Sequence, residues 1–128
     1  MTVLETKVLV VEDEALVRMD LAGHLEEAGY DVVECGSAAE ALEILERDRA
    51  TRVVFNDVRM PGDMDGAALA KFVRQRWPPT IIVVCSGNSE EASDVADIHL
   101  LPKPYLVDDV QLVLRAVAAQ LSQPGENS

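Results

Sequence analysis

Five polar side chains at the ends of short apolar runs have types that could carry out chemistry. They are Glu12 and Asp13 after the first run, Asp57 after the third, Ser86 after the fourth and Lys103 after the fifth. In open parallel sheets, ligands bind beyond the carboxyl ends of the strands, near the point where the strand order reverses. If these runs are parallel strands, three carboxylates, a hydroxyl and an ammonium group meet at one rim of the sheet.

This set of groups favours phosphoryl chemistry assisted by a divalent cation. Three neighbouring carboxylates repel one another, and a hard cation relieves that repulsion. Oxygen ligands without histidine or cysteine favour Mg2+, which takes one or two carboxylates and leaves room for a phosphate oxygen. Carboxylates can act as nucleophiles, and Lys103 and Ser86 would supply a cationic donor and a hydroxyl for the phosphoryl oxygens.

The chain alternates apolar runs with segments of helical periodicity. The runs are rich in β-branched residues, as in strands buried on both faces. They cover Val8–Val11, Val32–Val33, Val53–Phe55, Ile81–Val84 and Ile98–Leu101. The helical stripes are Val17, Leu21, Leu25 and Ala28; Ala38, Ala41, Leu42 and Leu45; Leu69, Phe72 and Val73; and Val110, Val113, Leu114, Val117 and Leu121. This alternation predicts a parallel α/β sheet covered by helices on both faces.

Boundary signals agree with these elements. Gly29 is placed as a C-cap, and Ser37 with Glu40 forms a capping box that opens the second helix. Asp65 can cap the third helix, which ends before Trp77-Pro78-Pro79.

Composition limits the class of protein. The 128 residues, 48% of them hydrophobic, suit one domain, which we place at residues 1–121 with a frayed tail at 122–128. The net charge of −12 argues against direct binding to nucleic acid or to anionic membranes. No apolar run approaches the roughly 20 residues of a membrane span and no signal peptide is evident, so we expect a cytoplasmic protein. Cys35 and Cys85 are interpreted as reduced core thiols.

Four motifs together resemble a bacterial response-regulator receiver domain. They are Val-Leu-Val-Val-Glu-Asp-Glu at 8–14, Asn-Asp-Val-Arg-Met-Pro-Gly at 56–62, Cys-Ser-Gly at 85–87 and Lys-Pro-Tyr at 103–105. The resemblance runs from about Lys7 to Leu121. It implies a flavodoxin-like, doubly wound sheet of five parallel strands in the order 2-1-3-4-5, for which a receiver protein is itself a standard example.

The resemblance also implies roles for the site residues. Asp57 would be the phosphoacceptor. Asp13, Asp57 and the main-chain carbonyl of Arg59 would bind Mg2+ directly, and Glu12 would act through water. Lys103 would pair with Asp57 or its phosphate, and the bond between Lys103 and the following proline is expected to be cis.

The same resemblance implies a switch and a set of partners. Ser86 would move to hydrogen-bond the phosphate while Tyr105 turns inward, although Tyr105 alone could equally be an amphipathic aromatic at the sheet edge. The phosphodonor would be a sensor histidine kinase or a histidine phosphotransfer protein, and the output would pass to a downstream protein partner. The family also forms homodimers.

One feature departs from the family pattern. Only 17 positions separate Ser86 from Lys103, several fewer than in typical receivers. The deficit falls between Gly87 and Ile98, where few apolar residues are available, so we expect a short or irregular fourth helix and a remodelled partner surface.

Three alternative interpretations concern the activity of the chain and its context. A phosphohydrolase with an aspartyl nucleophile is disfavoured, because that enzyme family needs a second aspartate at the position of Arg59. A degenerate receiver that acts only as an interaction module would normally lack the acceptor, an acid or the lysine, and all are present. The chain could be a stand-alone receiver or a piece of a longer regulator or hybrid kinase.

Overall fold

The computed structural model describes residues 6–59, 64–87 and 97–122. Strands and helices alternate along these segments. In chain order they are β1 (Lys7–Val11), α1 (Ala15–Glu27), β2 (Asp31–Cys35), α2 (Ala38–Arg47), β3 (Thr51–Asp57), α3 (Gly66–Arg76), β4 (Ile81–Ser86), β5 (Ile98–Pro102) and α4 (Val107–Leu121). The predicted helix between Gly87 and Ile98 falls almost wholly on residues 88–96, outside the described residues.

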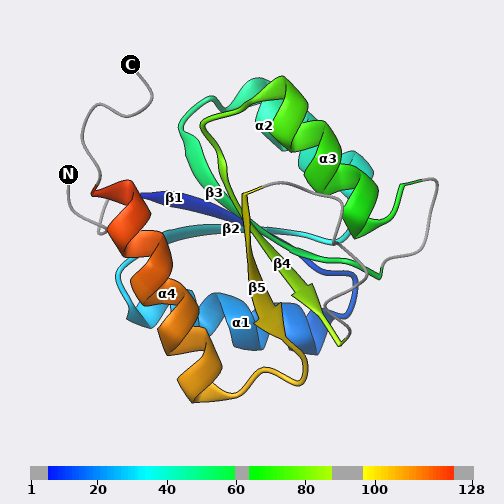
Figure 1. Ribbon diagram of the computed structural model, residues 1–128. Helices are drawn as coiled ribbons and strands as arrows, with labels where there is room; N and C mark the ends of the chain where they lie inside the picture. Colours follow the sequence, from blue (N-terminus) through cyan, green and yellow to red (C-terminus); the bar gives the residue numbers. More distant parts are fainter. Residues whose placement is uncertain (1–5, 60–63, 88–96, 123–128) are drawn as a thin grey trace.

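The strands form one five-stranded parallel sheet in the order β2-β1-β3-β4-β5. Figure 1 shows the sheet between two layers, with α2 and α3 on one face and α1 and α4 on the other. The predicted doubly wound, flavodoxin-like architecture is therefore confirmed. Among the described residues, no helix combines the length and apolar character that crossing a bilayer requires.

Each strand sends alternate side chains into two separate cores. Leu9, Val54 and Ile82 pack with residues of α2 and α3. Val8, Val10, Val53, Phe55, Val83 and Leu101 pack with residues of α1 and α4. Side chains alternate between the two faces of a sheet with a period of two. The same alternation sets the face toward which a side chain at or just after the end of a strand points. Glu12, Asp57 and Lys103 continue the alternation that faces α1 and α4.

The helices pack largely as predicted, with two corrections. Ala28, predicted to continue the apolar stripe of α1, is the exposed C-cap of that helix, because the chain turns away from the sheet there. Leu69 and Val73 of α3 are buried, but Phe72 is 38% exposed. Its ring instead meets Trp77 edge-on, with ring centroids 6.2 Å apart. The predicted stripe of α3 was thus too wide, because periodicity alone cannot show where the sheet beneath a helix ends.

The predicted helix boundaries are supported by hydrogen bonds. Ser37 accepts a bond from the amide of Glu40, and the Glu40 carboxylate accepts one from Gly36. Asp65 accepts a bond from the amide of Ala68 at the start of α3. These caps satisfy amide groups that the first helical turn leaves without partners. The two helices therefore begin directly after their capping residues, Ser37 and Asp65.

Arg74 of α3 anchors the start of β5. Its guanidinium donates hydrogen bonds to the main-chain oxygens of Pro78 at 2.8 Å, Thr80 at 3.0 Å and Asp97 at 2.7 Å. One planar group thereby ties the loop before β4 to the residue before β5. The register of β5 matters for the site, since this strand leads directly to Lys103.

Candidate functional site

Three carboxylates converge at the carboxyl ends of β1 and β3. Oxygen atoms of Glu12, Asp13 and Asp57 lie within 4.8 Å of one another. These strands are neighbours in the sheet, and Val11 pairs with Asn56, so their ends lie side by side. The structure thus brings together the three acids that the sequence placed at one rim.

Glu12 is the most deeply buried of the three acids, with 1% of its surface exposed. Its Oε2 atom accepts a hydrogen bond from the amide of Glu14 at 3.1 Å, whereas Oε1 is without a hydrogen bond among the described residues. Burial raises the pKa of Glu12 to about 7, and the neighbouring Asp57 adds to this rise. A carboxylate of this kind binds a proton or a cation near neutral pH.

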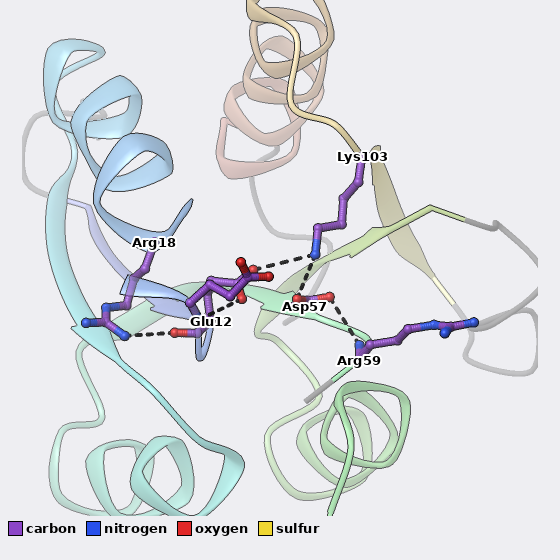
Figure 2. A network of polar contacts seen from close by, with 6 residues as sticks. Glu12, Arg18, Asp57, Arg59 and Lys103 are labelled. Carbon is purple, nitrogen blue, oxygen red and sulfur yellow. Dashed lines mark hydrogen bonds and ion pairs between the residues drawn. The ribbon is translucent and has the colours of Figure 1, made fainter. Parts of the chain in front are cut away.

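Lys103 provides the positive charge of the site. Its Nζ atom donates a hydrogen bond to Oδ2 of Asp57 at 2.8 Å and lies 3.7 Å from Oε1 of Glu12 (Figure 2). Burial acts to lower the pKa of Lys103, but the hydrogen bond to Asp57 and the two acidic charges outweigh it and raise this pKa. The peptide bond between Lys103 and Pro104 is cis, as expected.

Both oxygens of Asp57 are held by different groups. Oδ2 meets Lys103, and Oδ1 accepts a hydrogen bond from the main-chain N–H of Arg59 at 3.1 Å. The residue is only 3% exposed. Figure 2 shows its carboxylate between these two donors. The two donors therefore fix the direction of the Asp57 carboxylate, which also lies close to the carboxylates of Glu12 and Asp13.

Ser86 lies on the strand next to Asp57, and Tyr105 lies in the segment between β5 and α4. Ser86 ends β4 and is buried, and its main-chain oxygen accepts a hydrogen bond from the amide of Lys103 at 3.0 Å. Tyr105 packs against the core beneath α1 and α4, with its hydroxyl buried and without a hydrogen bond in the described part of the chain. The ring already faces inward in this structure.

Both cysteines are free and buried, as predicted. Burial raises the pKa of Cys35 to about 11 and that of Cys85 to about 12. They therefore remain protonated thiols near neutral pH and behave as core residues.

The residues at this rim fit a hard divalent cation. The donors are carboxylate oxygens close enough to share one ion, and one buried oxygen of Glu12 has no hydrogen-bond donor among the described residues. Such an all-oxygen set favours Mg2+ over metals that prefer nitrogen or sulfur. Asp13 is exposed, so its side of the cluster is open to water and to an incoming group.

Comparison with known protein families decides what kind of domain carries this site. Residues 8–100 match the model of the response regulator receiver domain. The chain belongs to the response regulator receiver family. It is therefore a receiver domain of two-component signalling, and its acidic cluster is typical of the Mg2+ site of receivers.

Individual receivers show similar sequences and folds. The transcriptional regulatory protein PdtaR of Mycobacterium tuberculosis is 35% identical over 108 residues, covering 81% of this chain and 52% of PdtaR. This receiver thus spans about half the length of that relative. The receiver domain of NtrX from Brucella abortus is 30% identical with a TM-score of 0.80, covering 91% and 99% of the two chains. The chemotaxis response regulator CheY4 of Vibrio cholerae is 28% identical with a TM-score of 0.79, covering 88% and 98%.

Sequence reasoning missed one residue that contacts the receiver site. Arg18, on α1, donates a hydrogen bond to the main-chain oxygen of Glu12 at 2.9 Å. The available signal was a cationic residue in the second turn of a helix that directly follows the acidic pair. That signal is weak without the fold, since exposed helix faces commonly carry arginine.

The raised pKa of Glu12 predicts that Mg2+ binding by this receiver depends on pH. A proton on the carboxylate must leave before the oxygen can serve a cation, so lowering the pH from about 8 to about 6 should weaken Mg2+ binding by about tenfold. Amide NMR titrations with Mg2+ at several pH values would measure this change. In Glu12→Gln, the Mg2+ affinity should be lower than that of the native chain at pH 8 and should change less between pH 6 and pH 8. A native affinity that does not change over this range would contradict the prediction.

Proposed function

We propose that this receiver is switched by phosphorylation of Asp57, with Mg2+ and with a phosphohistidine of a sensor kinase or phosphotransfer protein as donor. The observation that carries the proposal is the setting of the Asp57 carboxylate. It is buried, lies within the acidic cluster and is oriented by Lys103 and the amide of Arg59. Receiver domains pair with histidine kinases.

The transfer step follows from these positions. An oxygen of Asp57 attacks the phosphorus of the donor, the P–N bond to the donor's histidine breaks, and its electron pair returns to the imidazole nitrogen. Lys103, now 2.8 Å from Oδ2 of Asp57, can follow the charge to a phosphoryl oxygen. Mg2+, when bound, would neutralise charge on the transferring oxygens.

Asp57 would share the ion with Glu12 and Asp13, which do not themselves react. Asp13 and Asp57 are assigned as direct ligands together with the main-chain carbonyl of Arg59, and Glu12 as a ligand through water. The chain is a signalling module and not a classical enzyme. Its own chemistry comprises acceptance of the phosphoryl group and slow hydrolysis of the aspartyl phosphate.

Ser86 and Tyr105 would transmit the change. Ser86 lies at the end of the strand next to β3, and the residue before it pairs with Asp57. We propose that its hydroxyl hydrogen-bonds the phosphoryl group and that Tyr105 reports this movement to β5 and α4. Residues 1–121 form the switching unit in this scheme and 122–128 its tail.

A group of exposed apolar side chains beside the site suits the binding of a protein phosphodonor. Leu16 is 82% exposed, and Met19, Leu106 and Val107 are also exposed. A cavity of about 380 Å3 lies between α1 and the segment after β5, lined by Leu16, Val17, Asp20, Lys103, Pro104 and Tyr105. Exposed apolar side chains of this kind mark interaction surfaces. A partner seated there would bring its histidine to Asp57 and exclude water.

The proposal is tested by amide NMR with Mg2+ alone and then with Mg2+ plus beryllofluoride, which mimics the phosphoryl group. In the native chain, shifts should spread from Asp57 to Ser86 and Tyr105. In Asp57→Ala, the beryllofluoride response should be absent because the anchoring carboxylate is gone. An identical response in both chains, or one that stays within the loops, would leave an acidic cation-binding domain without a switch.

A further inference from the structure

Arg18 fixes the backbone from which the acidic pair projects. Its Nη1 atom donates to the main-chain oxygen of Glu12 at 2.9 Å, and its Nε atom donates to Oε1 of Glu34 at 3.2 Å. The guanidinium therefore joins α1 to the end of β1 and to β2 at once. Arginine suits this task because its planar fork presents several donors in a fixed geometry.

The bond to Arg18 is one of two that hold the backbone of Glu12. On the other side, the amide of Glu12 donates to the main-chain oxygen of Cys35 at 3.1 Å. Figure 2 shows the carbonyl of Glu12 directed at Arg18 and its carboxylate directed the opposite way, toward Lys103. The peptide group after Glu12 is also the link to Asp13, so its plane governs where both acids point.

The guanidinium of Arg18 lies beside Gly36. A Cβ atom added at Gly36 would lie 3.4 Å from Nη1, at ordinary van der Waals contact, so the arginine packs closely against this part of the chain. The side chain of Arg18 is partly buried, with 22% of its surface exposed, and is paired with Glu34. The contact to Glu12 is therefore a built arrangement of three elements and not a loose surface pair.

We propose that Arg18 is a positioning residue for Mg2+ binding, acting through the main chain of Glu12 on the orientation of Glu12 and Asp13. The inference rests on the proposed function, because it concerns the same cation site. The proposal predicts the direction in which Mg2+ affinity changes when Arg18 is removed. Removing a positive charge near an acidic cluster should tighten cation binding if charge alone mattered. Loss of positioning should weaken it instead.

The test compares Arg18→Ala with Arg18→Lys and with the matched control Arg76→Ala. Arg76 also pairs with a glutamate, Glu46, at 2.9 Å, and its guanidinium lies 5.5 Å from the Trp77 ring. It lies at the end of α3, away from the acidic cluster of the site. Mg2+ affinity is measured by amide NMR titration, and hydrogen exchange of the Glu12 amide is measured in the metal-free protein.

We expect Arg18→Ala to weaken Mg2+ binding by about tenfold, as for other groups that orient metal ligands, and to speed exchange of the Glu12 amide. Arg18→Lys keeps the positive charge but not the planar guanidinium, so its Mg2+ affinity should lie between those of the native chain and Arg18→Ala. Arg76→Ala should stay within about twofold of the native affinity. If Arg18→Ala does not fold, Arg18→Lys against the native chain decides.

Two results would overturn the inference while leaving the proposed function intact: native or tighter Mg2+ binding in the Arg18 variants, or equal weakening in Arg76→Ala. Failure of the native chain to bind Mg2+ at Glu12, Asp13 and Asp57 would overturn the proposed function, and this inference with it.

Discussion

Asp57→Asn is expected to abolish uptake of a phosphoryl group from a small acyl phosphate in the presence of Mg2+. The substitution keeps the shape of the side chain and one oxygen, but the amide is a far weaker nucleophile than the carboxylate. The rate should fall by on the order of 10³-fold or more, because the covalent step itself is lost. Intact-mass spectrometry after a timed reaction measures the phosphorylated fraction.

Asp65→Asn is the matched control for this change. Asp65 lies on the same rim, but its carboxylate caps α3 through the amide of Ala68. Asparagine is an equally good N-cap, so stability should be unchanged. Phosphorylation should therefore proceed at close to the native rate. Continued uptake in Asp57→Asn would move the acceptor to another residue and contradict the assignment of Asp57.

Gly66→Ala is expected to be the most destabilising single substitution of a glycine in the described chain. A Cβ at this position would overlap the main-chain oxygen of Asp57 and come within 2.5 Å of the Cα of Val58. Two hydrogen bonds also fasten this point: the amide of Gly66 donates to Val58 and the side chain of Asn56 donates to the oxygen of Gly66. The free energy of unfolding should fall by about 3 kcal/mol or more, since the backbone has to move to relieve the overlap.

The position of Gly66 predicts a second effect, on the site. Because the start of α3 rests on the backbone of Asp57, relief of the overlap displaces the acceptor carboxylate. Denaturant unfolding and the phosphorylation assay should therefore both report a loss. Gly23→Ala is the control, since nothing lies within 4 Å of a Cβ there. Alanine inside α1 should stabilise the protein by roughly 0.5–1 kcal/mol. Equal stability of the two variants would refute the close approach at Gly66.

Much of the site could be predicted from the sequence, because strand ends are set by local patterns. Apolar runs predicted which segments form the sheet, and the parallel arrangement placed Glu12, Asp57 and Lys103 at one rim. Such patterns depend on neighbours within a few positions, and those are visible in one sequence.

The sequence also predicted the helix caps, but it misjudged the width of a helix stripe. Ser37 and Asp65 cap their helices as expected. Phe72 shared the period of the buried residues of α3 and is nevertheless exposed. A period gives the direction of a side chain, whereas burial depends on what lies opposite it.

Only the tertiary structure decided the distances and the environment within the site. Lys103 and Asp57 are 46 positions apart, and their 2.8 Å contact depends on the register of β3, β4 and β5. The burial that raises the pKa of Glu12 and the reach of Arg18 to its carbonyl likewise arise from packing between distant segments. The sequence by itself therefore determined the family, the fold and the chemical groups of the site. Their spacing came from long-range packing, because local patterns carry no measure of how strands and helices dock.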